Sequence, residues 1–205
     1  MRIIQPSVKV EEFDGKKMLR KIEKAGRTCY KSEDRITDES AGKFVTNIIK
    51  RGHESVLEHE KITARVICDR GVSHELVRHR IASYSQESTR YVRYDKDVEF
   101  IEPCFWAVPH KRAYYKRWQV AMSIAEMAYK GLLDIGATPQ EARSVLPNSL
   151  KTEIVVTMNL RAWRNFFKLR CDKAAHPQIR QIAFMLLKDI SNGLPIVFDD
   201  IVKEF

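Results

Sequence analysis

Apolar residues occur along this chain in short runs that polar or charged residues interrupt. A membrane-spanning helix needs about 20 consecutive apolar residues, so this chain must bury its apolar side chains through amphipathic helices and strands. The opening residues, MRIIQPSVKVEEF, lack the long apolar stretch of a secretory signal. A chain of 205 residues is long enough to support its own core. We therefore expect one α+β domain over residues 1–205.

Two kinds of periodicity divide the chain into elements. Residues 61–68 alternate in polarity and residues 152–158 are rich in β-branched side chains, which predicts two strands. Mixed charge in residues 11–35 indicates a solvated face. Helices are predicted over 16–27, over 38–51 with Thr37 as cap, from Ser73 to about Ala82, over about 110–135, from the capping box at Thr138, after the cap Asn159, and from Pro177 to near Gly193.

The formal net charge is +9, and its location is informative. Residues 61–93 carry a net charge of +4 and residues 151–182 carry +5, so these two segments account for the whole excess. Compact basic segments favour an anionic partner: a nucleic acid, a membrane surface or a phosphorylated small molecule. A solvated basic face is the alternative.

The cysteines indicate a reducing compartment. They are widely spaced and form no CxxC pair, so we expect free thiols and a cytoplasmic protein. Cys171 adjoins an arginine but is expected to be a small buried thiol rather than a nucleophile. Residues 53–59 contain two histidines and two glutamates, but without the HExxH spacing, so no metal site is expected.

The densest polar cluster begins with Arg78-His79-Arg80. Hydroxyl side chains and two further arginines follow in one short segment, at Ser83, Ser85, Ser88, Thr89, Arg90 and Arg93. Guanidinium groups bind phosphate with two parallel hydrogen bonds, and hydroxyls add neutral donors. The cluster therefore predicts an anion site, unless the arginines only complement a helix dipole.

In its setting, ELVRHRIASYSQESTRYVRY, the triplet followed by Ser88 resembles the signature of the flavin-dependent thymidylate synthases. Three further segments resemble the same family in the same order: AGRTCYKS from Ala25, HESVLEH from His53, and Asn159-Leu160-Arg161 with Asn165 and Leu169-Arg170-Cys171-Asp172. The resemblance spans roughly residues 25 to 190.

This resemblance implies a fold and a reaction. The family converts dUMP to dTMP, taking the carbon from methylenetetrahydrofolate and the reducing equivalents from NADPH through FAD. Its members are homotetramers with active sites at subunit interfaces, built on a twisted, mostly antiparallel sheet flanked by helices. All these ligands are anionic, in agreement with the two basic segments, and neither nucleic acid nor membrane is an expected partner.

The resemblance also implies roles for individual residues. Arg170 would be catalytic, stabilising the uracil ring deprotonated at N3, because a guanidinium stays charged without transferring the proton. FAD would contact Ser55, Arg78, His79, Arg80, Gln86, Asn159, Arg161 and Asn165. The nucleotide would contact Glu75, Arg78, Glu87, Ser88, Thr89, Arg90, Arg143 and Arg170.

Two positions depart from the family pattern, and two other functions stay open. Glu75 stands where relatives carry an amide, and the acidic group expected at Gln86 is shifted to Glu87, so either could face the ring. A basic nucleic-acid-binding module would use the pI of about 9.4 and the tyrosines at 84, 91 and 94. A flavin reductase would oxidise NADPH without methyl transfer.

Overall fold

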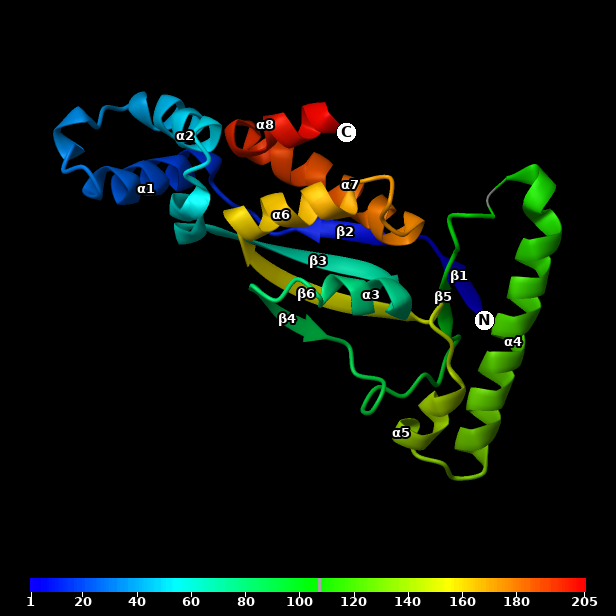
Figure 1. The fold of residues 1–205 in the computed structure, drawn as a ribbon. Coiled ribbons are helices and arrows are strands. Elements are labelled where there is room, and N and C mark those ends of the chain that lie inside the picture. The colour runs from blue at the N-terminus through cyan, green and yellow to red at the C-terminus, as the bar shows by residue number, and fades with distance from the viewer. Residues whose placement is uncertain (107) are drawn as a thin grey trace. The chain divides into compact units, whose positions relative to one another are not determined.

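The computed structural model of this chain describes residues 1–106 and 108–205 (Figure 1). Its elements are β1 (Arg2–Ile4), β2 (Ser7–Val10), α1 (Gly15–Thr28), η1 (Glu33–Arg35), α2 (Ser40–Lys50), η2 (Glu54–His59), β3 (Lys61–Asp69), α3 (Arg70–Leu76), β4 (Ala82–Gln86), β5 (Glu99–Ile101), η3 (Pro109–Lys111), α4 (Arg112–Asp134), α5 (Pro139–Ala142), η4 (Arg143–Val145), β6 (Lys151–Asn159), α6 (Leu160–Arg170), α7 (Pro177–Gly193) and α8 (Pro195–Glu204), where η marks a 3-10 helix.

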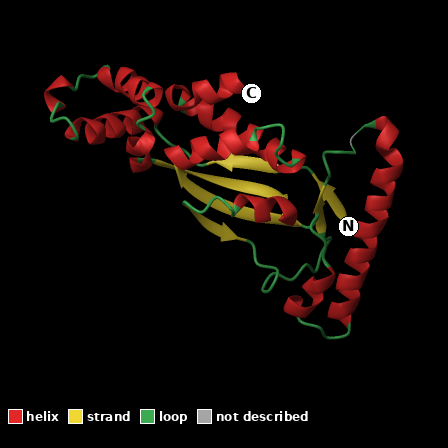
Figure 2. Ribbon diagram, in the orientation of Figure 1, coloured by secondary structure: helices red, strands yellow, loops and turns green. Residues whose placement is uncertain are grey.

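The strands form two sheets. One has four strands in the order β2-β3-β6-β4, and the other pairs β1 with β5 in parallel, with Ile3 opposite Phe100. The larger sheet is mostly antiparallel, and helices flank it (Figure 2). The predicted α+β class is therefore confirmed. Among the described residues, no helix combines the length and apolar character needed to cross a bilayer.

The chain forms two compact units. The first unit comprises residues 1–7, 66–78 and 85–155, and the second comprises 8–65, 79–84 and 156–205. Strands β3, β4 and β6 each contribute residues to both units. The expectation of one domain over residues 1–205 stays a prediction.

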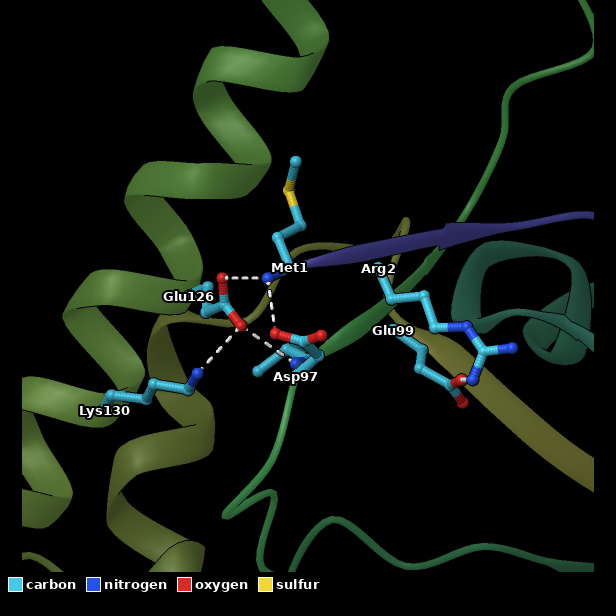
Figure 3. Close-up of polar contacts among 7 residues, drawn as sticks. Met1, Arg2, Asp97, Glu99, Glu126 and Lys130 are labelled. Atoms are coloured by element: carbon cyan, nitrogen blue, oxygen red, sulfur yellow. Dashed lines mark hydrogen bonds and ion pairs between the residues drawn. The ribbon is translucent and has the colours of Figure 1, made fainter.

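The core of the first unit forms between α4 and the segment around β5. Phe100, Trp118 and Tyr129 are among its buried side chains. Beside this core, the Glu126 carboxylate accepts from the Val98 N–H at 3.0 Å and pairs with the α-ammonium of Met1 at 2.8 Å (Figure 3). Burial opposes ionisation of this carboxyl, but the ammonium, the Val98 N–H and Lys130 together lower its pKa to about 2.

The core of the second unit is aromatic. On α6, Trp163 stacks on Phe167 with ring centroids 5.6 Å apart, and Phe198 of α8 meets Phe167 edge to face. Arg164 lies within this core with 1% of its surface exposed. Its guanidinium pairs with Asp200 at 2.5 Å and with Glu54 at 3.1 Å, which satisfies a charge that would otherwise be costly to bury.

Most predicted elements are confirmed, including α1, α2, β3, α4, β6 and α7. The helix predicted from Ser73 to Ala82 is wrong at both ends. It begins at Arg70 because the Asp69 carboxylate accepts from the Val72 N–H at 2.8 Å, and it ends at Leu76. Residues 82–86 form β4, since pairing with the sheet overrides the local helical pattern.

The predicted cap of α2 is also wrong. Glu39 occupies the N-cap position and makes no side-chain cap. The Thr37 N–H instead donates to the Ser40 hydroxyl, which in turn donates to Glu23. Helix α8 was not among the predicted elements.

Candidate active site

Four of the predicted substrate-binding residues meet in the first unit. Ser88, Thr89 and Arg90 lie in the loop after β4, and Arg143 opens η4. Arg143 Nη1 donates to Thr89 Oγ1 at 3.2 Å, and Ser88 Oγ accepts from the Arg90 N–H at 3.3 Å. Gln140 of α5 accepts from Arg90 Nε at 2.9 Å, which ties the loop to α5. Two guanidinium groups and two hydroxyls make a donor set suited to a phosphate.

Glu87, the neighbour of this group, is engaged by protein partners. The Tyr94 hydroxyl donates to one carboxylate oxygen at 2.7 Å, and Lys151 Nζ donates to the other at 2.9 Å. Burial and the adjacent carboxylate raise the pKa of Tyr94, so this phenol stays protonated. Glu87 therefore anchors the loop to the start of β6.

Gln86 is also anchored. Its amide nitrogen donates to Ser73 Oγ at 2.9 Å and to Thr152 Oγ1 at 3.1 Å. Glu75 lies half-buried near the end of α3, and Arg78 lies exposed just beyond that helix. Gln86 and Glu87 are the two residues that could face the pyrimidine ring. Both are held by protein partners, and the choice between them stays open.

In the second unit, Arg170 and His79 form a close pair. Arg170 is the last residue of α6, and its Nε donates to His79 Nε2 at 3.0 Å. The imidazole packs edge-on against Phe166, with ring centroids 4.9 Å apart. Burial, and then the Arg170 charge, lower the pKa of His79 to about 4, so the ring is neutral near pH 7 and its Nε2 can accept.

The other end of α6 holds the predicted flavin contacts. Asn159 caps the helix, accepting from the Ala162 N–H at 2.8 Å, and Arg161 pairs with Glu58 at 2.6 Å. Asn165 is exposed on the same helix. Asn159 and Glu58 both line a cavity of about 430 Å³, together with residues 81–83, which directly follow Arg80. Asn159 is thus the predicted flavin contact that lines this cavity.

Ser55 lines a larger cavity of about 580 Å³ between α1, α2 and η2. The lining side chains include several cations and two aromatic rings, but no carboxylate among those described. The cations are Arg27, Arg35, Lys43 and Arg51, and the rings are those of Tyr30 and Phe44; His53 also lines the cavity. A cationic cavity with aromatic walls fits a ligand that joins phosphates to an aromatic ring, as FAD does.

Arg27 is aimed by a buried carboxylate. Glu23, with 1% of its surface exposed, accepts from Arg27 Nε at 3.0 Å and from Nη2 at 2.7 Å. Ser40 Oγ donates to the other Glu23 oxygen at 2.8 Å, and the guanidinium lies 5.0 Å from the centre of the Phe44 ring. The interpretation of residues 11–35 as a solvated face was therefore wrong for Glu23 and Arg27.

The Cys171 thiol beside Arg170 is poorly suited to act as a thiolate nucleophile. Cys171 is buried as predicted, and burial raises the pKa of its thiol to about 11. Within residues 1–106 and 108–205, no group of three or more His, Cys, Asp or Glu side chains could hold a metal ion.

Sequence reasoning missed the residues that position the predicted ones. Gln140 and Lys151 hold Arg90 and Glu87, but they stand far from them in the chain, so no local pattern indicated the contacts. Glu23 and Arg27 were detectable, because an acidic and a basic residue four positions apart on a helix commonly pair.

Known proteins of one family are similar to this chain over most of its length. A model of the family described as thymidylate synthase complementing protein matches residues 14–196. The flavin-dependent thymidylate synthase of Pyrococcus furiosus is 37% identical over 170 residues, covering 81% of this chain and 69% of that protein. Those of Geobacter sulfurreducens and Mycobacteroides abscessus are 38% and 35% identical, each over 78% of its own length and over 86% and 87% of this chain.

A solved structure shares the fold. The UMP/dUMP methylase PolB from Streptomyces cacaoi, bound with 5-Br dUMP, aligns with a TM-score of 0.81 and 24% sequence identity. The alignment covers 100% of this chain and 98% of that one. The predicted α+β architecture therefore recurs over the whole chain.

Proposed function

This chain belongs to the flavin-dependent thymidylate synthase family, and on that premise we propose that it reductively methylates dUMP to dTMP. The carbon donor is methylenetetrahydrofolate, and NADPH reduces the bound FAD. The observation that carries the proposal is the donor set of Ser88, Thr89, Arg90 and Arg143, which distant segments assemble in the first unit.

In this proposal the first unit supplies most of the groups that bind the nucleotide. Ser88 and Arg90 bind the phosphate, with Thr89 fixing the Arg143 guanidinium beside them. Glu75, Arg78 and Glu87 complete the nucleotide contacts that the family resemblance implies. Arg170 stabilises the negative charge that develops when N3 of the pyrimidine loses its proton, because its guanidinium stays cationic throughout.

The second unit supplies most of the groups that hold the flavin, which provides the hydride chemistry when bound. His79 and Arg80, with Asn159, Arg161 and Asn165 of α6, contact the flavin, and Arg78 and Gln86 add to these contacts. Ser55 binds the cofactor's phosphates. The cationic side chains of the 580 Å³ cavity support this last assignment, because a diphosphate needs several donors and neutralising charges.

We further propose a cytoplasmic homotetramer whose active sites lie at subunit interfaces. Helix α4 supports self-association: Val120, Ile124 and Met127 follow one another at helical spacing and are 59%, 56% and 66% exposed. Contiguous exposed apolar side chains commonly mark a protein interface. Sedimentation or light scattering of the purified protein measures the subunit number directly.

The test of the function begins with the visible spectrum. The protein is incubated with FAD, separated from excess, and then titrated with dUMP. A retained flavin spectrum that dUMP perturbs supports the proposal, and dTMP formation with methylenetetrahydrofolate and NADPH completes it. A colourless protein that binds oligonucleotides with steep salt dependence would favour the nucleic-acid-binding module instead.

The same assay distinguishes the proposed synthase from a flavin reductase. A reductase without methyl transfer oxidises NADPH at the same rate with and without dUMP and forms no dTMP. Dependence of dTMP formation on both dUMP and the folate excludes it.

A further inference from the structure

We propose that His79 is a positioning residue for Arg170: its Nε2 accepts from Arg170 Nε and fixes the plane of the guanidinium that acts on the pyrimidine. This role differs from the flavin contact that the family resemblance implies for His79. What Arg170 does rests on the proposed function, whereas the contact between the two side chains stands on the geometry alone.

The imidazole is itself held in place. Its ring packs against Phe166, which is fully buried in the aromatic core of the second unit. The Tyr84 hydroxyl donates to the His79 carbonyl oxygen at 2.8 Å, which fixes the backbone beside the ring. Because both anchors are part of the fold, His79 offers Arg170 an acceptor whose position is set before any ligand binds.

A histidine suits this task because it orients without adding a charge. Arg161 and Arg164, on the same helix, pair with carboxylates, which partly neutralise each guanidinium. A neutral imidazole accepts the same kind of hydrogen bond and leaves the positive charge undiminished by that contact. A guanidinium that must stabilise a developing anion gains from this arrangement.

The protonation state of His79 determines whether its Nε2 can accept the hydrogen bond from Arg170. Nε2 can accept only when the ring is neutral with its proton on Nδ1. Desolvation and the Arg170 charge both disfavour the imidazolium, so the accepting form prevails near pH 7. Removal of the Arg170 guanidinium eliminates one of the two causes that lower the pKa of His79.

The first experiment needs neither flavin nor substrate. In ¹⁵N-histidine NMR spectra of the unliganded protein, we expect His79 to show an unprotonated Nε2 and an acid titration near pH 4. In Arg170→Ala, this titration should move to higher pH. A His79 that titrates identically in both proteins, or that carries its proton on Nε2, would overturn the proposal.

The second experiment uses the loaded enzyme and a double-mutant cycle. We expect His79→Ala to lower kcat for dTMP formation at least about tenfold when FAD is supplied at a concentration that saturates the variant. His79→Gln places an amide oxygen near the position of Nε2 and should restore most of kcat. His79→Ala combined with Arg170→Ala should be no slower than Arg170→Ala alone, because the two residues act as one unit.

The outcomes separate the proposal from the function on which it rests. Loss of FAD in His79→Ala with unchanged kcat in the flavin-loaded fraction, or multiplicative effects in the cycle, would leave His79 as a flavin contact only. A wild-type protein without dTMP formation would refute the proposed function, and the NMR titration would still decide the contact. His74→Gln, at an exposed position of α3, controls for a general effect of replacing a histidine.

Discussion

The two units hold their candidate site residues in different ways. In the first unit, Arg90 and Arg143 are exposed, and their guanidinium groups donate to Gln140 and Thr89. In the second unit, Arg170 ends a helix that buries Trp163, Phe166 and Phe167. A hydrogen bond that involves a charged group contributes about 1.5–3 kcal/mol net, whereas a helix face that buries several large side chains contributes more. Substitutions in the first unit should therefore change binding more than folding.

The largest effect should come from the buried arginine of the second unit. Arg164→Ala leaves the carboxylates of Asp200 and Glu54 without their guanidinium and opens a cavity in the aromatic core. Breaking a buried ion pair in this way costs about 3–5 kcal/mol. Urea denaturation monitored by tryptophan fluorescence measures this loss of unfolding free energy.

Arg161→Ala is the matched control on the same helix. Its ion pair with Glu58 is exposed, and exposed pairs contribute about 0–1 kcal/mol. Equal destabilisation by the two variants would contradict the view that burial makes the second unit rigid.

The next effect concerns activity, not folding. Arg170→Ala should lower the rate of dTMP formation about 100-fold or more, because the developing negative charge loses a preorganised cation. The FAD spectrum should persist, since Arg170 is not among the proposed flavin contacts. Rapid-quench turnover and flavin absorbance measure the two quantities separately. Full turnover in this variant would remove Arg170 from the reaction.

Much of this fold could be predicted from the sequence. A long segment with a periodic pattern of apolar residues forms an element that buries its apolar face, whatever its place in the fold. The stripe of apolar residues in 38–51 predicted α2, and the Asn159 cap and the α7 stop near Gly193 were located closely. The predictions for short segments were less successful. Asp69 and Ser73 are both potential N-caps of α3. Two potential caps four residues apart cannot be ranked without the surrounding backbone.

The candidate site was predictable only where its residues are close in the chain. The Arg78–Arg93 segment drew attention because its cations and hydroxyls are adjacent, whereas Gln140 and Lys151 reach it through the fold alone. The contact between His79 and Arg170 joins two predicted residues, yet their separation of 91 positions hid the pairing. Sequence therefore predicts which residues contribute to the site, and the structure shows which of them are in contact.

A smaller effect concerns the first unit, where the stability that Glu126 contributes should depend on pH. Glu126→Gln removes a carboxylate whose pKa is lowered to about 2, mainly by the Met1 ammonium against the opposing cost of burial (Figure 3). Because this pKa lies below its ordinary value, the stability Glu126 contributes is present above about pH 5 and is lost as the pH falls toward 2. We expect Glu126→Gln to be about 1–2 kcal/mol less stable at pH 7, with the difference shrinking on acidification. Thermal unfolding at several pH values tests this, and a constant difference would contradict it.

The smallest effect should come from Ser88, a half-buried residue whose hydroxyl is a neutral member of the first unit's cluster. Ser88→Ala removes one neutral donor from the proposed phosphate site, which costs about 1 kcal/mol, or a roughly fivefold rise in KM for dUMP. The unfolding free energy, kcat and the flavin spectrum should stay near wild type. Ser144→Ala, an exposed serine in η4, serves as the control. Loss of flavin in Ser88→Ala would assign this hydroxyl to the cofactor, and a large drop in unfolding free energy would show that the loop of the first unit is held as firmly as α6.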